Sequence, residues 1–193
     1  MQVMLLSDQD LIQQYLNGDE RAFETLLTRH KTKIYTSIYL FTRDNEVAED
    51  IFQEVFIKII DTLRKGKYNH EGKFLQWAMR IAYNMCVDQF RRTKRSAQLN
   101  MGENFDVFTV IPSADDNMEQ FLIKDQGTRN IKSLVDQLPA EQREVVILRH
   151  YADMSFKEIS LLTRVSINTA LGRMRYALIN LRRMMEERVE MAY

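Results

Sequence analysis

The spacing of the apolar residues constrains the fold of this chain more than any other feature. Apolar side chains recur at intervals of three and four residues along almost all of the 193 residues, whereas alternating β-branched runs bounded by turns are hard to find. Only six glycines and two prolines interrupt this pattern. An α-helix places every third and fourth residue on one face, so the sequence predicts an all-α protein.

A loss of periodicity divides the chain. Residues 96–116 contain Gly102, Pro112 and several acids, which is a composition typical of a linker. We therefore expect two helical domains, over residues 5–95 and 117–187, with the linker between them. Hydrophobic residues form 45% of the chain, which is enough for a packed core.

Capping residues mark the helix ends of the first domain. Ser7 followed by Asp10 predicts the start of a short helix, and Asp19 opens the next helix. A break at residues 42–44 precedes a third helix over residues 45–64. The caps and this break thus predict three helices before the first glycine-rich loop.

The third expected helix has an unusual outward face. The face mixes acceptors with large aliphatic groups: Glu46, Asp50, Gln53, Ile57 and Ile60. Such a mixture favours contact with a partner protein. Packing of the two isoleucines against a neighbouring helix of the same chain would explain it equally simply.

A basic loop follows, and it carries one aromatic residue. Tyr68 lies within RKGKYNHEGK, where its ring either stacks on a nucleobase or covers the core. Residues 74–95 then form one long helix, for which we expect a core face of Phe74, Trp77, Ala78, Ile81 and Met85. We expect the opposite face to contain no acid. Its residues are Gln76, Arg80, Tyr83, Asn84, Val87, Arg91 and Lys94. Basic, amide and aromatic groups on one face favour a nucleic-acid surface over an ordinary solvated face.

The segment of residues 155–185 predicts two helices joined by a tight turn. Ser155 and Glu158 form a capping box, and Ser166 caps the second helix after a turn at residues 164–165. The outward face of the second helix is suited to a DNA groove, and it carries Asn168, Thr169, Gly172, Arg173, Arg175 and Tyr176. A helix-turn-helix DNA reader and a solvated helix pair remain equally open from this stretch alone.

The chain lacks the motifs of the common catalytic and metal sites. It has no GxxxxGK[ST], GxGxxG, HExxH or CxxC sequence. The residues His30, His70 and His150 stand in different elements, and Cys86 has no histidine partner at a useful spacing. We therefore expect no enzyme, no catalytic residue, no metal site, no cofactor and no small-molecule substrate.

Composition also bears on compartment. No apolar run is long enough to span a bilayer, and the first residues lack the basic start and cleavage site of a secretory signal. The single cysteine allows no internal disulfide and fits a reducing cytoplasm. We expect a cytoplasmic chain without direct membrane insertion.

These motifs occur in an order that resembles the extracytoplasmic-function group of bacterial sigma factors. The resemblance rests on AEDIFQEVFIKI at 48–59, FLQWAMRIAYNMCVDQFRRTKR at 74–95, the acidic linker and the terminal helix-turn-helix. It implies a subunit that binds RNA polymerase core, through the β′ clamp helices and the β subunit, and directs initiation from specific promoter DNA. Members of this family are commonly regulated by an anti-sigma factor.

The resemblance also implies three sets of site residues. The polymerase-binding set is Asp50, Gln53 and Glu54, with Ile57 on the same face. The minus-ten set contains Tyr68 in the loop that receives a flipped base, together with Arg80, Tyr83, Asn84, Arg91, Arg92 and Lys94. The minus-thirty-five set is the outward face of the recognition helix. This helix departs from the family pattern at Leu171 and Gly172, where basic or hydroxyl residues are frequent.

Two other functional classes remain open from the sequence. One is a conventional helix-turn-helix repressor or activator whose first domain dimerises or binds a ligand. The other is a helical adaptor that binds only protein. The nucleic-acid face of residues 74–95 argues against the adaptor, and the segment at residues 48–59 argues against the repressor.

Overall fold

The computed structural model describes residues 6–69, 72–100 and 133–190. Within these ranges the protein consists of helices, turns and loops and contains no strand. The all-α prediction is therefore confirmed for the described residues. The expected linker lies mostly outside them, because only its first residues belong to a described helix.

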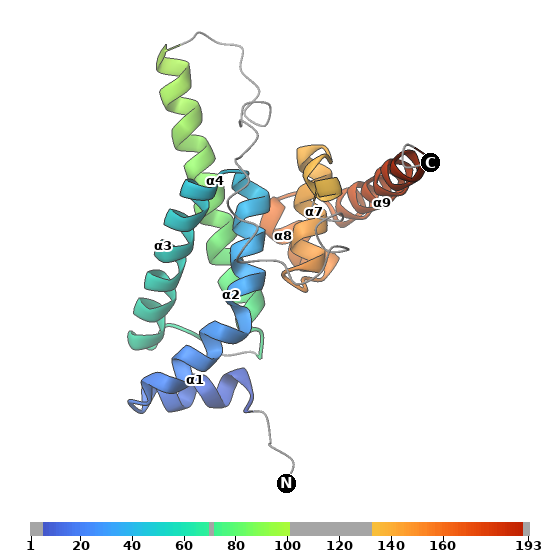
Figure 1. Cartoon of the computed structure of the whole chain (residues 1–193). Helices are drawn as coiled ribbons and strands as arrows, with labels where there is room; N and C mark the ends of the chain where they lie inside the picture. Colours follow the sequence, from blue (N-terminus) through green and yellow to red (C-terminus); the bar gives the residue numbers. More distant parts are fainter. Residues whose placement is uncertain (1–5, 70–71, 101–132, 191–193) are drawn as a thin grey trace.

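Four helices form the first domain (Figure 1). They are α1 (Asp8–Leu16), α2 (Glu20–Thr42), α3 (Asn45–Arg64) and α4 (Phe74–Asn100). Helix α2 packs against the three others. Its residues Leu26, Ile34 and Ile38 are fully buried, and they meet Ile59 of α3 and Phe74 of α4 in one hydrophobic core.

The helix starts predicted at Ser7 and Asp19 are confirmed. Ser7 and Asp10 form a reciprocal capping box at the start of α1, and Asp19 accepts from the backbone amide of Arg21. Arg43 ends α2 with a φ of 57°, and Asp44 caps α3 by accepting from the amide of Val47. Short side chains that satisfy exposed helix amides thus set the boundaries of α1, α2 and α3.

The core face of α4 is wider than predicted, because Trp77, Ile81 and Met85 pack at the edge of the core and its most buried residues lie about a quarter turn away. Phe74 and Ala78 are buried as expected, but Trp77, Ile81 and Met85 are only half buried. The buried face instead contains Leu75, Met79, Ala82, Tyr83 and Cys86. The reason is that α2 and α3 both pack on α4 and together cover a side that periodicity alone does not single out.

The exposed residues of α4 also correct the expectation that its solvent face carries no acid. Asp88 lies exposed on α4, and its carboxylate is 3.4 Å from the guanidinium of Arg91. The solvent face of α4 is therefore basic with one acid, rather than wholly basic and neutral.

The second domain contains α7 (Ala140–His150), α8 (Phe156–Thr163) and α9 (Ile167–Glu190). Pro139 precedes α7, as expected. Arg143 is buried, and its guanidinium donates to the backbone carbonyls of Asp136 at 3.1 Å and Leu138 at 3.5 Å. Burial lowers the pKa of Arg143. A buried arginine thereby closes the turn that leads into α7.

Helices α8 and α9 form the predicted helix-turn-helix. Ser155 and Glu158 make the capping box of α8, and the hydroxyl of Ser166 accepts from the amide of Thr169 at 3.0 Å at the start of α9. The turn between them places Arg164 at a φ of 59°. This left-handed conformation is costly for a residue with a Cβ atom.

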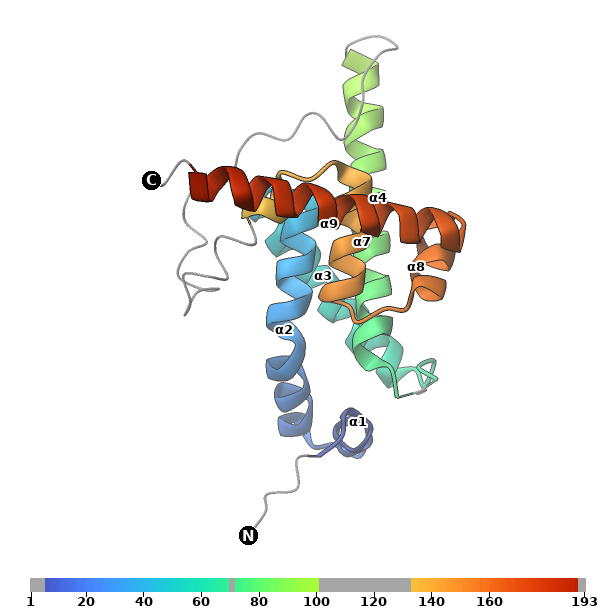
Figure 2. The same ribbon diagram turned by 90° about the vertical axis from the view of Figure 1, so that its right-hand side faces the viewer.

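The two domains lie against each other. Helix α7 packs on α2, and both views show it alongside the upper part of that helix (Figures 1 and 2). Three ion pairs cross the boundary among the described residues. Arg43 Nε lies 2.8 Å from Asp136, Lys33 Nζ lies 2.9 Å from Asp153, and Lys73 Nζ lies 2.8 Å from Glu158. Among the described helices, none is both long and apolar enough to cross a membrane.

Arg164→Gly should raise the free energy of unfolding by about 0.5–1 kcal/mol, because glycine adopts the left-handed turn without the steric cost of a side chain. Urea denaturation followed by circular dichroism measures the change. Arg164→Ala is the matched control and should give no comparable gain. Gly18→Ala, at a φ of 103° with no atom near the added Cβ, should instead lose stability. A less stable Arg164→Gly protein would contradict the strain at this turn.

Candidate polymerase and nucleic-acid interfaces

The outward face of α3 is exposed, as the sequence predicts. Asp50, Gln53 and Glu54 are exposed, and 67% of Ile57 is accessible to solvent. Ile60 is half buried. An isoleucine this exposed beside three acceptors is unusual for a solvated helix and fits a protein-binding surface.

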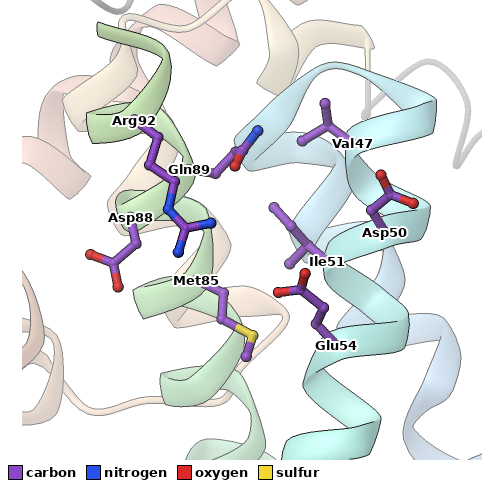
Figure 3. Close-up of a pocket in the computed structure, with 8 residues that line it drawn as sticks. All are labelled: Val47, Asp50, Ile51, Glu54, Met85, Asp88, Gln89 and Arg92. Atoms are coloured by element: carbon purple, nitrogen blue, oxygen red, sulfur yellow. The ribbon is translucent and has the colours of Figure 1, made fainter. Parts of the chain in front are cut away.

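A groove of about 250 Å³ runs between α3 and α4 (Figure 3). Its walls contain Val47, Asp50, Ile51, Glu54, Met85, Asp88, Gln89 and Arg92. Glu54 points into the groove from α3, and Arg92 extends into it from α4 (Figure 3). The structure thus brings Arg92, which was expected at the minus-ten element, together with the predicted polymerase-binding acids.

Tyr68 lines a second pocket, of about 200 Å³. Its ring is half buried, with ring centroids 4.4 Å from Trp77 and 6.3 Å from Phe74. One side of Tyr68 therefore covers the core while another faces the pocket, so both expectations for this residue fit the structure. The pocket walls are Tyr68, Asn69, Lys73, Gln76, Trp77, Arg80 and Glu158.

The pocket combines flat rings with cations. Trp77 and Tyr68 offer stacking surfaces, while Lys73 and Arg80 offer charges for phosphate. Lys73 was not among the expected site residues. Its place in the same basic loop as Tyr68 is the sequence feature that could have identified it.

The remaining expected minus-ten residues are divided by the fold. Arg80, Asn84 and Arg91 are exposed on α4, and Lys94 is half buried. Tyr83 is buried, and its hydroxyl donates to Glu144 of α7 at 2.7 Å. In this conformation Tyr83 faces the second domain and not solvent.

Glu144 lies at the centre of this contact between the domains. It accepts from Tyr83 and also from Arg173 of α9, at 3.4 Å. Burial raises the pKa of Glu144, while the bond from Tyr83 and the charge of Arg173 act in the opposite direction. Burial likewise raises the pKa of the Tyr83 hydroxyl, which therefore stays a donor at neutral pH.

The outward face of α9 is largely open. Asn168 and Arg175 are exposed, and 62% of Tyr176 is accessible. A Cβ atom added at Gly172 would meet nothing within 4 Å, so a partner can approach the backbone there. Thr169 is exposed but also bonded to the Ser166 hydroxyl, at 2.8 Å.

Arg173 lies apart from that open face. It pairs with Glu141 at 3.2 Å as well as with Glu144. An exposed apolar row lies beside the buried side of α9 and was not expected to be a site. It includes Leu171, Leu178 and Met185.

Comparison with known proteins now adds to this geometry. Residues 26–96 match the family model of sigma-70 region 2, and residues 128–176 match that of sigma-70 region 4. The chain is 27% identical over 170 residues to the RNA polymerase sigma-H factor of Pseudomonas aeruginosa, covering 86% of this chain and 87% of that protein. It is also 27% identical over 166 residues to the sigma factor SigW of Bacillus subtilis, covering 84% and 88%.

A solved structure shares the fold. The sigma factor RpoE of Bartonella quintana, in complex with the anti-sigma factor NepR, superposes with a TM-score of 0.61 at 19% identity. The match covers 85% of this chain and 96% of that one. This likeness extends to the pair of domains and supports the two-domain architecture.

The chain belongs to the sigma-70 family, in the extracytoplasmic-function group. It is an RNA polymerase sigma factor that directs promoter-specific initiation of transcription. Its partners are RNA polymerase core and promoter DNA. Members of this family are not enzymes.

Glu158→Gln should lower the free energy of unfolding by about 1 kcal/mol near neutral pH, because it removes the ion pair with Lys73. The effect is small because the Lys73 side chain is exposed and water screens the pair. The bond from Lys73, and then that from the Ser155 amide, lower the pKa of Glu158 to about 2. A lowered carboxyl pKa stabilises the fold above the pKa of the unfolded state, and this stabilisation is lost as the pH falls through the folded value.

The stability difference between the two proteins should therefore be constant above about pH 5 and shrink as the pH falls toward 2. Urea denaturation across this range measures it. Glu187→Gln, at an exposed pair within α9, is the control and should show a smaller difference at every pH. A Glu158→Gln difference that does not change with pH would rule out this account.

Proposed function

We propose that the two promoter elements are read by different domains, in agreement with the domain bounds 5–95 and 117–187 expected from the sequence. The first domain recognises and opens the minus-ten element, and the second reads the minus-thirty-five element. The observation that carries this assignment is the pocket in which Tyr68 and Trp77 lie beside Lys73 and Arg80.

In the first domain, a base leaving the duplex stack enters the Tyr68 pocket. Unstacking a base costs a few kcal/mol, and stacking on an aromatic ring offsets a comparable amount. Lys73 and Arg80 neutralise the adjoining phosphates, while Asn84 offers an amide for a base edge. Arg91 and Lys94 extend the basic surface along α4. Opening of the DNA then draws on binding energy alone, without a catalytic step.

In the second domain, α9 lies in the major groove with its open face toward the bases. Arg175 is able to bond a guanine edge through two donors, and Asn168 suits an adenine edge. Thr169, Gly172 and Tyr176 complete this face. Arg173, which is paired with Glu141 and Glu144, lies at the edge of the face and approaches phosphate only after those pairs separate.

Polymerase core docks on α3. The exposed face of Asp50, Gln53, Glu54 and Ile57 binds the clamp helices of the β′ subunit, and the groove beside it accepts a side chain from that partner. Since Arg92 lies in this groove, we assign it to the polymerase side of α4. The chain works in the cytoplasm, where RNA polymerase acts, and it has no catalytic activity of its own. An anti-sigma factor is a further expected partner.

Glu54→Arg should weaken binding to RNA polymerase core by about tenfold or more, because it reverses a charge at the centre of the proposed contact. Glu49→Arg is the matched control, since Glu49 is also exposed on α3 but lies about 140° away around the helix. Competition with a labelled sigma factor for core measures both variants. Equal losses for the two variants would place the polymerase contact elsewhere.

Tyr68→Ala and Arg175→Ala should each impair the recognition of one promoter element. The promoter is first identified by sequencing the transcripts that rise when the protein is overexpressed. Loss of one stacked base or one arginine contact costs about 1–3 kcal/mol. Tyr68→Ala should lower strand opening but keep the minus-thirty-five sequence preference.

Arg175→Ala should relax the minus-thirty-five sequence preference and leave opening from a preformed bubble unchanged. An equal loss from Arg175→Ala on all duplex sequences would make it a backbone contact.

A further inference from the structure

One apolar side chain lies exposed within the face of α9 that the proposed function turns toward DNA. Leu171 is 44% accessible to solvent. In the described part of the chain it is not one of the partly buried apolar side chains that pack against the hydrophobic core. At 100° per residue, Leu171 lies about 40° around the helix from Arg175 and about 60° from Asn168. A leucine that the fold does not bury therefore lies beside two groups assigned to base edges.

The surroundings of Leu171 favour a polyanion as the partner that covers it. Arg175 and Arg182 are exposed on the same side of the helix. No acid occurs in α9 before Glu186. A Cβ atom added at the neighbouring Gly172 would meet nothing within 4 Å, so the backbone of this turn is open to close approach. Cations beside an open backbone suit the phosphates and base edges of a DNA groove.

We propose that Leu171 reads the 5-methyl group of a thymine in the minus-thirty-five element. This inference rests on the proposed placement of α9 in the major groove. Of the four bases, thymine alone presents a methyl group there, and apolar side chains contact it. Helix-turn-helix proteins contact base edges through the first residues of their second helix, and α9 begins only four residues before Leu171, at Ile167. Leu171 thereby adds a preference for thymine to the guanine and adenine contacts assigned to Arg175 and Asn168.

Position along α9 separates Leu171 from the rest of the exposed apolar row. Leu178 is 54% accessible, but it lies seven residues, or about 10.5 Å, further along the helix. Met185 lies about 21 Å further along. The major groove is about 12 Å wide and about 8.5 Å deep. A helix that enters the groove by its first turns therefore brings Leu171 to the bases and leaves Leu178 outside the groove.

The test uses holoenzyme assembled from the full chain and RNA polymerase core, on the promoter identified from the overexpression transcripts. The minus-ten region is supplied as a preformed bubble, so that strand opening does not limit the affinity. Each thymine of the minus-thirty-five element, on either strand, is replaced in turn by deoxyuridine, which lacks only the methyl group. Competition against a labelled promoter measures the affinity of each duplex.

One of these replacements should lower the affinity of the wild-type holoenzyme by about fourfold. This factor corresponds to about 0.8 kcal/mol for a buried methyl group, at about 1.4 kcal/mol per tenfold change. In Leu171→Ala the same replacement should have no measurable effect. Because Leu171 is exposed and alanine favours the helix, this variant should fold as the wild type does.

Leu178→Ala is the matched control, since it removes the same side chain from the same exposed row of the same helix. It should keep the fourfold dependence on the methyl group. Leu171→Met retains an apolar side chain of similar volume and should keep most of that dependence.

The possible results separate this inference from the proposed function. Equal affinity for every deoxyuridine duplex, or an element without thymine on either strand, would overturn the role of Leu171. A methyl dependence that persists in Leu171→Ala would overturn it as well, because another side chain then contacts the methyl group. A loss of affinity for core polymerase in Leu171→Ala, without any methyl dependence, would assign Leu171 to a protein contact instead. If Arg175→Ala still relaxes the minus-thirty-five preference in these cases, the proposed function stands; if neither variant alters that preference, the proposed function fails.

Discussion

The partly buried carboxylate of Glu144 helps to fix the relative placement of the two domains. Removing a carboxylate from water is costly, and the cost is offset only when donors satisfy its oxygens. Tyr83 supplies one donor from α4, and Arg173 supplies the other from α9. Because these donors belong to different domains, Glu144 is satisfied only while α4, α7 and α9 stay together. This contact therefore defines the arrangement of the two domains more specifically than surface ion pairs could define it.

Helix α4 links three surfaces through its periodicity. Arg92 borders the groove shared with α3, Tyr83 meets α7, and Arg80 borders the Tyr68 pocket. Twelve residues of helix separate Arg80 from Arg92, which corresponds to about 18 Å along the axis. Since a packed helix is rigid, a partner seated in the α3–α4 groove holds the Tyr68 pocket at a fixed distance and orientation. If the proposed assignments hold, docking of polymerase and capture of a base are geometrically coupled.

Local chemistry was predictable from the sequence, and tertiary packing was less so. The caps at Ser7, Asp19 and Ser155 could be predicted because each depends on a few neighbouring residues. The buried side of α4 could not, since it is fixed by where α2 and α3 lie. The burial of Tyr83 depends on a glutamate 61 residues further along the chain. Exposed groups such as Asp50 and Arg175 were recognisable, but the ion pairs between the domains, such as that of Lys73 with Glu158, were not.

The two proposed binding surfaces differ in access, and this difference sets an order. The α3–α4 groove is lined by residues of the first domain alone, whereas the Tyr68 pocket has Glu158 of the second domain in its wall. On the proposed assignment, polymerase can thus reach α3 while the two domains are packed together. The crossing pairs of Lys33 and Lys73 have side chains about half exposed, so each contributes little and is weakened by salt. Glu144, the less exposed pair of Arg43 with Asp136, and the apolar contacts between α2 and α7 hold the domains together more strongly. A partner separates the domains only if it binds the separated form more tightly than the packed one by enough to offset these contacts.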